Sequence, residues 1–181
     1  MVLLLMAIEA QPQKIKVEKP QYAAVWDVAT QCPAQVFYIL TPDNLGSAKR
    51  KPFWRFKRDI SHPFMMASHG DYTKSGFHRG HLLPAQDRSS SAQEMKETFC
   101  MSNVAPQTPS LNCGEWKQTE NYVRRLTAYY DSIGVLVVPI YLARDTVRFS
   151  SAQVCVPHAF FKAVWNLKND SVLCAWFVFN K

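Results

Sequence analysis

The chain has 181 residues, of which 48% are hydrophobic and 19% are charged, and this composition is typical of one folded domain. No apolar run approaches the roughly 18 to 20 residues that a membrane-spanning helix needs, so insertion into a membrane is not expected. Five cysteines without any Cys-x-x-Cys pair argue against a complete disulfide framework and against a four-cysteine zinc site.

The net charge of +7 is concentrated in one segment. Residues 49–58, called the basic segment below, contain six Lys or Arg and no acidic residue. Phe53, Trp54 and Phe56 are interleaved with these cations. Cations bind phosphates and aromatic rings stack on bases, so the basic segment suits a nucleic acid. A solvated loop with its rings turned into the core is the alternative interpretation.

The first ten residues are rich in Leu and end in a small residue, as a secretory signal does, but they lack its basic start. A signal remnant and the start of an ordinary strand or helix both remain open. The signal interpretation predicts a secreted or periplasmic protein. We accordingly expect an N-terminal segment at residues 1–19 and a single domain over residues 20–181.

Five short runs rich in β-branched and aromatic residues predict strands, bounded by Pro, Asn, Asp or Gly. They cover residues 36–40, 99–104, 135–141, 160–165 and 172–179. With the two helices described next, they predict an α+β fold.

A short helix is expected over residues 91–98, because Ser91 is followed three residues later by Glu94, a capping-box pattern. A longer helix is expected over about residues 113–130. On a helical wheel, Trp116 and Val123 belong to one apolar face of this longer helix.

Residues 59–90 form a long irregular stretch that holds four of the five histidines, and such loops are usually functional. Three polar fragments lie in or after it: Gly-Phe-His-Arg-Gly-His at 76–81, Ser-Asn-Val-Ala-Pro-Gln at 102–107, and Leu-Asn-x3-Trp-x3-Glu-x3-Arg at 111–124. Together they supply an imidazole, two carboxamides, a carboxylate and two guanidiniums. Phosphodiester hydrolysis needs this set.

Each group has a plausible task. The imidazole of His81 can take a proton from water near neutral pH. Arg79 and Arg124 can hold phosphate oxygens in pairs. One carboxamide oxygen and an outer-sphere carboxylate can hold a hydrated Mg²⁺. On the same wheel, Asn112 and Glu120 lie about 40° to either side of Trp116, within or beside the apolar face, which turns them inward. An exposed Glu120–Arg124 pair is the alternative.

These fragments resemble the DNA/RNA non-specific endonucleases of the ββα-metal superfamily. That family's signature is Asp-Arg-Gly-His, then Ser-Asn-(apolar)-x-Pro-Gln, then Leu-Asn and a helix bearing Glu and Arg. The resemblance covers about residues 20 to 180. It implies a ββα-metal nuclease fold, with a mixed, mainly antiparallel sheet and a long active-site helix. It also implies hydrolysis of DNA and RNA to 5′-phosphate ends, with Mg²⁺, or Mn²⁺, as cofactor.

The resemblance also implies roles for individual residues. His81 would be the general base, and Asn112 the direct protein ligand of the metal ion. Glu120 would orient the waters around that ion. Arg124 would bind the phosphate and stabilise its developing charge. Asn103 would support the His81 loop through hydrogen bonds.

Further residues are expected to contact the substrate. Arg79 would contact phosphate or acidic partners around it. The remaining candidates for substrate binding are Arg55, Lys57, Arg58 and His78. The expected partners are DNA and RNA, and a homodimer is an assembly that the resemblance allows.

His78 stands where most of the family has Asp. If this change abolishes catalysis, the alternative function is that of a catalytically impaired nucleic-acid-binding protein with the same fold. A third interpretation is a structural zinc module built from His78, His81, Cys100 and Cys113. Its His-x2-His spacing is permissive, but the two cysteines are not a paired knuckle.

Overall fold

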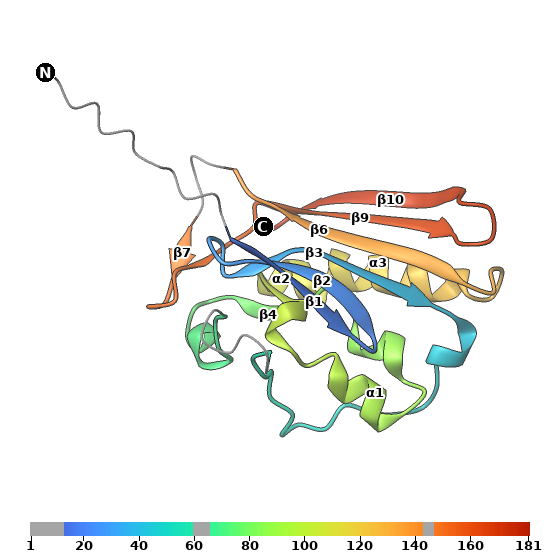
Figure 1. Ribbon diagram of the computed structural model, residues 1–181, viewed down its shortest axis with the longest axis horizontal. Coiled ribbons are helices and arrows are strands. Elements are labelled where there is room, and N and C mark those ends of the chain that lie inside the picture. Colours follow the sequence, from blue (N-terminus) through green and yellow to red (C-terminus); the bar gives the residue numbers. More distant parts are fainter. Residues whose placement is uncertain (1–12, 60–65, 143–146) are drawn as a thin grey trace, which may run out of the picture.

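The computed structural model describes residues 13–59, 66–142 and 147–181 (Figure 1). The predicted signal remnant at residues 1–10 lies outside these residues. Strand β1 (Lys14–Lys19) pairs in antiparallel fashion with β2 (Tyr22–Asp27). The sheet therefore begins at residue 14, upstream of residue 20, where the sequence placed the start of the domain.

One six-stranded sheet organises the molecule, in the order β1-β2-β3-β6-β9-β10. Its other members are β3 (Cys32–Leu40), β6 (Ile133–Ile140), β9 (Ala159–Asn166) and β10 (Val172–Phe179). All neighbouring strands are antiparallel. This architecture confirms the α+β class with a mainly antiparallel sheet. Between β3 and β6 the chain leaves the sheet, and this long excursion contains the basic segment, the two predicted helices and the three polar fragments.

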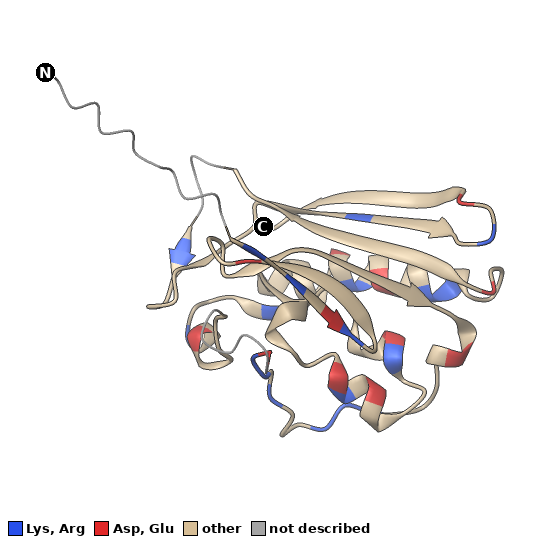
Figure 2. Cartoon of the chain, viewed as in Figure 1, with Lys and Arg blue, Asp and Glu red and all other residues tan. Residues whose placement is uncertain are grey.

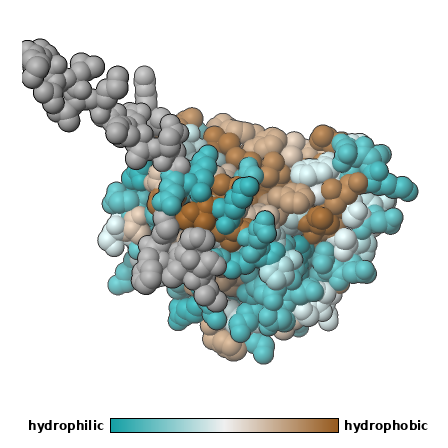
Figure 3. Space-filling model, viewed as in Figure 1, coloured by the Kyte–Doolittle hydropathy of each residue, from teal (hydrophilic) through white to brown (hydrophobic). Residues whose placement is uncertain are grey.

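Alternation of side chains explains how the edge of this sheet forms. In β1, Ile15 and Val17 are buried, while Lys14, Lys16 and Glu18, which alternate with them, face solvent. On the face seen in Figure 3, apolar surface gathers in the upper half, where the sheet lies. Hydrophilic surface covers most of the lower half, around α1 (Ala92–Glu97).

The excursion contains the two strands and the helix that characterise the ββα-metal fold. Strand β4 (His78–His81) pairs in antiparallel fashion with β5 (Val104–Gln107). Helices α2 (Pro109–Cys113) and α3 (Glu115–Leu126) follow, and α3 runs along one face of the sheet (Figure 1). The ring of Trp116 on α3 lies 5.2 Å from that of Phe160 on β9, which fixes the helix against the sheet.

Shorter elements complete the excursion and the C-terminal part. Strands β7 (Arg148–Phe149) and β8 (Val154–Cys155) form a small separate pair. Single 3-10 turns occur at η1 (Pro42–Asn44), η3 (Gly70–Tyr72), η4 (Ala85–Arg88) and η5 (Met101–Asn103). Within the described ranges, no helix has the length and apolar character needed to cross a membrane.

The strand predicted over residues 99–104 is wrong. Residues 101–103 form the turn η5, and β5 begins only at Val104. The segment before the turn instead bonds to the basic segment, where Lys57 N donates to Phe99 O at 3.0 Å and Met101 N donates to Lys57 O at 2.8 Å. All six residues are buried, including the polar Ser102 and Asn103, so the run does not have the two-residue alternation of a half-buried strand.

The longer helix predicted over about residues 113–130 is confirmed as α3, but it is shorter at both ends and Gly114 separates it from α2. Helix α2 begins earlier, at Pro109, where the side chain of Thr108 accepts a hydrogen bond from Leu111 N at 3.2 Å. The backbone of Gly114 (φ −103°, ψ −109°) then leaves the helical region. Asn112 consequently lies on α2 and not on the helix that carries Glu120. The shorter helix was predicted correctly, and the side chain of Ser91 caps it.

Replacing Gly114 by Ala should displace α2. A Cβ at this position would meet the backbone carbonyl oxygen of Ser110 at 2.5 Å, and a backbone atom cannot rotate away. We expect the free energy of unfolding in denaturant to fall by about 1–3 kcal/mol. The matched control is Gly70→Ala, whose Cβ would meet only the Ser68 hydroxyl at 3.5 Å. Equal losses in the two variants would contradict this explanation.

Candidate active site

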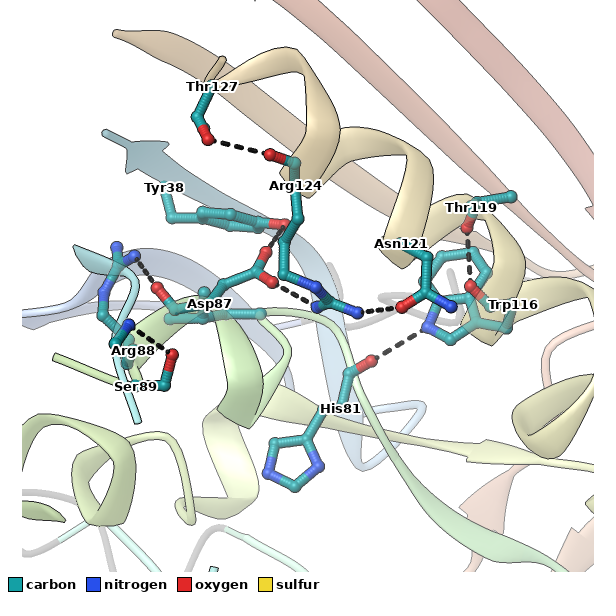
Figure 4. A network of polar contacts seen from close by, with 12 residues as sticks. Tyr38, His81, Asp87, Arg88, Ser89, Trp116, Thr119, Asn121, Arg124 and Thr127 are labelled. Atoms are coloured by element: carbon teal, nitrogen blue, oxygen red, sulfur yellow. Dashed lines mark hydrogen bonds and ion pairs between the residues drawn. The ribbon is translucent and has the colours of Figure 1, made fainter. Parts of the chain in front are cut away.

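The ring of His81, at the end of β4, packs against aromatic side chains. The ring centroid lies 4.8 Å from those of both Phe56 and Phe99. Its backbone carbonyl accepts a hydrogen bond from Trp116 Nε1 at 3.2 Å, which ties the end of β4 to the first turn of α3 (Figure 4). The ring nitrogen Nε2 is buried and has no hydrogen-bond partner among the described residues. Because none of the described residues bonds to it, this nitrogen can accept a proton from a group that enters the site.

The electrostatic surroundings of His81 favour its neutral form. Burial of the ring, with a smaller contribution from the charge of Arg50, lowers the pKa of His81 from its ordinary value to about 3. The imidazole is therefore unprotonated at neutral pH, which is the state a general base requires.

Asn103 holds the chain segment that directly follows His81. Its Oδ1 accepts a hydrogen bond from Leu83 N at 2.7 Å, and its Nδ2 donates to Leu83 O at 2.9 Å and to Thr98 O at 3.0 Å. Asn103 is fully buried, so these bonds form without competition from solvent. The hydrogen bonds expected between Asn103 and the His81 loop are thus present.

Asn112 and His78 lie side by side, although 34 residues separate them in the sequence. Nδ2 of Asn112 is 3.0 Å from Nδ1 of His78. The exposed thiol of Cys113 is 3.9 Å from the same ring nitrogen. The residue expected to bind the metal therefore contacts the histidine that replaces the family's Asp.

Arg124 is engaged by a carboxylate that the sequence did not reveal. Its Nη1 lies 2.6 Å from Oδ1 of Asp87, and Oδ2 of Asp87 accepts a hydrogen bond from Tyr38 at 3.1 Å (Figure 4). Asp87 is fully buried. Burial raises the pKa of Asp87, and the charge of Arg124 opposes this rise. The ion pair fixes one edge of the guanidinium of Arg124.

Glu120 also has an ionic neighbour that the sequence did not reveal. Burial raises the pKa of Glu120 to about 7, and the largest opposing contribution comes from the ammonium group of Lys162. Lys162 lies on β9 with no exposed surface, and its Nζ is 3.9 Å from the ring centroid of Trp116. The site thus extends into the core between α3 and the sheet.

Arg79 and Arg55 lie to either side of His69. Arg79 donates to the carbonyl oxygen of His69 from Nε at 3.0 Å and from Nη2 at 2.6 Å, and to Thr73 Oγ1 at 3.2 Å. Nη1 of Arg55 is 3.3 Å from Nε2 of His69. Burial, followed by the charges of Arg79 and Arg55, lowers the pKa of His69. The contacts of Arg79 are a carbonyl and a hydroxyl, not the acidic partners that the sequence suggested.

The basic segment borders a cavity of about 650 Å³, whose lining includes Phe99 but not His81. Lys57 and Arg58 line it together with Phe53, which is 72% exposed, and Phe99, whose ring also contacts His81. Figure 2 shows the run of Lys and Arg along this loop, next to α1. Arg55 lines the same cavity, so the three predicted substrate-binding cations of the basic segment lie together at this cavity.

The donor set fits a hydrated, oxygen-preferring cation. Asn112 offers a carboxamide, and Glu120 offers a carboxylate for the water around an ion, as Mg²⁺ accepts. In the described part of the chain, no three His, Cys, Asp or Glu side chains are grouped around a common point. The zinc module is therefore wrong, because such a site needs all four of its proposed ligands together. Those ligands were His78, His81, Cys100 and Cys113.

The lowered pKa of His81 predicts a pH-dependent stability. Between about pH 3 and pH 6.5 the folded protein binds fewer protons at this residue than the unfolded chain. The contribution of His81 is thus fully present above pH 6.5 and is lost as the pH falls toward 3. We expect the Tm of the wild type to fall more between pH 7 and about pH 4.5 than that of His81→Asn. Equal falls would show that the ring is accessible to solvent.

Comparison with known proteins gives a consistent result. Residues 6–178 match the model of a family described as DNA/RNA non-specific endonuclease. Mitochondrial endonuclease G of Bos taurus is 34% identical over 156 residues, which cover 81% of this chain and 52% of that protein. The mitochondrial nuclease EXOG of Danio rerio is 36% identical over 137 residues, which cover 70% and 40%. The chain thus spans about half the length of these relatives, or less.

A solved structure agrees in fold. A chain in the crystal structure of the EndoG/EndoGI complex superposes with a TM-score of 0.83 and 28% identity, covering 92% of this chain and 74% of that one. This match confirms the predicted nuclease fold. The expectation of a secreted or periplasmic protein is wrong, because the matched relatives are named mitochondrial nucleases. A short apolar start does not distinguish a secretory signal from other apolar segments.

Proposed function

Because the chain belongs to the DNA/RNA non-specific endonuclease family, we propose that it is a metal-dependent nuclease that hydrolyses phosphodiester bonds of DNA and RNA to 5′-phosphate ends. The observation that carries this proposal is the buried Nε2 of His81, which lacks a hydrogen-bond partner among the described residues. The ring of His81 contacts Phe99, which also lines the cavity bordered by the cations of the basic segment.

His81 acts as the general base. Its neutral imidazole accepts a proton from the attacking water at Nε2. A pKa of about 3 makes the free imidazole a weak base, but a bound phosphate anion raises this pKa and strengthens the base when substrate is present. Phe56 and Phe99 hold the ring in place, and Trp116 holds its backbone.

Asn112 holds the metal, Mg²⁺ or Mn²⁺. When bound, the ion supplies positive charge to the phosphate at which hydrolysis occurs. His78 orients the carboxamide, because its Nδ1, when it carries no proton, accepts from Nδ2 of Asn112 and leaves the amide oxygen for the metal. This hydrogen bond performs an orienting task without the negative charge of the Asp that most of the family has here.

Glu120 and Arg124, both on α3, act on the water around the metal and on the phosphate. Glu120, as the carboxylate, orients the water around the metal. Arg124 binds the phosphate with the donors of its guanidinium that Asp87 and Asn121 do not occupy, and its charge stabilises the transition state. Asp87 holds the guanidinium in one orientation, which reduces the entropy lost when phosphate binds.

Contacts to phosphate give affinity without base specificity. Arg55, Lys57 and Arg58 of the basic segment supply positive charge at the cavity, and the exposed ring of Phe53 is free to stack on a base. Arg79 supports this surface through the backbone carbonyl of His69. This set of contacts suits both DNA and RNA, since it reads the backbone that they share.

Replacing His81 by Ala should abolish most cleavage but little binding. Loss of a general base typically lowers turnover by about 10²- to 10⁴-fold, whereas affinity rests on many cations. Plasmid nicking with Mg²⁺ and the Kd for an oligonucleotide measure the two effects. The matched control is His158→Ala, at an exposed histidine. Turnover above about a tenth of wild type in His81→Ala would refute this role. A wild type that binds but never cuts would favour the nucleic-acid-binding alternative.

A further inference from the structure

Gln107, the last residue of β5, is a fully buried carboxamide. Neither its Nε2 nor its Oε1 has a hydrogen-bond partner among the described residues. A buried donor or acceptor without a bond destabilises the folded state, and an apolar side chain of similar size would fill the same space without that loss. The presence of a carboxamide at this position therefore requires an explanation.

The side chain of Gln107 packs against the backbone of β4. A Cβ on Gly80 would meet Oε1, Cδ and Cγ of Gln107, the last at 2.5 Å. The carboxamide thus occupies the space that any residue larger than glycine would need at position 80. Gly80 directly precedes His81, so Gln107 contacts the middle of the strand that carries both histidines of the candidate site.

The register of the two strands places Gln107 on the same face as His78. Gln107 pairs directly with His78, and Gly80 pairs with Ala105. Directly opposite residues, and residues two positions further along, share one face of a two-stranded ribbon. On this face, Nδ1 of His78 lies 3.0 Å from Nδ2 of Asn112. Gln107 therefore supports β4 on the face from which β4 contacts α2.

The backbone of Gln107 is held on both sides by one side chain, that of Asn180, which directly follows β10. Nδ2 of Asn180 donates to the carbonyl oxygens of Pro106 at 3.0 Å and of Pro157 at 2.8 Å. Its Oδ1 accepts from Thr108 N at 2.8 Å. Because the residues before and after Gln107 are fixed to the end of β10, its side chain is a rigid support for β4.

We infer that Gln107 is a positioning residue of the nuclease site, which binds a water molecule at its buried carboxamide and thereby holds β4, with His78, against Asn112. Water both donates and accepts, and it is the usual partner of buried polar groups that no protein group satisfies. The inference rests on the proposed function, because the position of His78 matters to the metal only if Asn112 holds that metal.

Replacing Gln107 by Met removes both hydrogen-bonding groups and keeps a flexible side chain of similar length. If the carboxamide is bonded as inferred, the Tm should fall by at least about 2 °C. If it has no partner, an apolar side chain leaves the Tm unchanged or raises it. The matched control is Gln35→Met, which removes the same group from an exposed position on β3 and should leave the Tm at the wild-type value.

The effect on the site is measured without nucleic acid and without catalysis. Titration with Mn²⁺, followed by the EPR signal of the free ion at a temperature well below both Tm values, gives the Kd for the metal. In Gln107→Met this Kd should rise at least about tenfold, as is usual when a group that supports a ligand is lost. It should be unchanged in Gln35→Met.

The outcomes separate positioning from packing. A crystal structure should show an ordered water within about 3.2 Å of Nε2 or Oε1 of Gln107, and a protein group in its place overturns the inference. An unchanged or raised Tm in Gln107→Met overturns it too. A lower Tm with an unchanged Kd for Mn²⁺ shows that Gln107 only stabilises the fold, which overturns the positioning role.

Two further results are also decisive. If Gln107→Met does not fold, Gly80→Ala takes its place in the Mn²⁺ titration, because its Cβ displaces the same carboxamide. An unchanged Kd in Gly80→Ala overturns the inference. A wild type that binds no Mn²⁺ refutes the proposed function instead, and the Tm of Gln107→Met and the crystal structure still test the water at Gln107.

Discussion

The buried carboxylate of Asp87 joins the three parts of the molecule that form the site. It binds Arg124 of α3 and Tyr38 of β3, and its own backbone belongs to η4, a few residues after His81. The next residue, Arg88, donates to the backbone carbonyls of Gln21, in the turn between β1 and β2, and of Ile39 on β3. A carboxylate taken out of water is tolerated only while its partners are in place. The loop after β4, helix α3 and the sheet are therefore fixed relative to one another.

Much of the fold could be predicted from local patterns. The strand over residues 172–179 and the helix capped by Ser91 were both found in this way. Two boundaries were missed for tertiary reasons. The buried run at 99–104 has no period because it is covered on every side, and the break at Gly114 depends on the nearby carbonyl of Ser110. Strand β1 was missed although its alternation was visible, because charged residues dominate it.

The sequence motif predicted the residues of the candidate site but not the buried charged residues next to them, Asp87 and Lys162. Asp87 and Arg124 are 37 residues apart, and no short pattern connects them. Lys162 did leave a signal, since it is in phase with Phe160 and Val164 in a predicted strand. A lysine at such a position has to be buried, and a buried lysine requires a counterion. Pairing between distant elements is decided by the assembled fold, so the identity of that counterion could not come from the sequence.

The Mg²⁺ dependence of cleavage by Asn112→Ala tests the central claim most directly, which is that this chain holds its metal through the carboxamide on α2. Gln118→Ala, at an exposed amide on α3, is the control. The account predicts that the Mg²⁺ concentration for half-maximal nicking rises at least about tenfold in Asn112→Ala. It should be unchanged in Gln118→Ala. Coinciding titration curves for Asn112→Ala and the wild type would contradict the account.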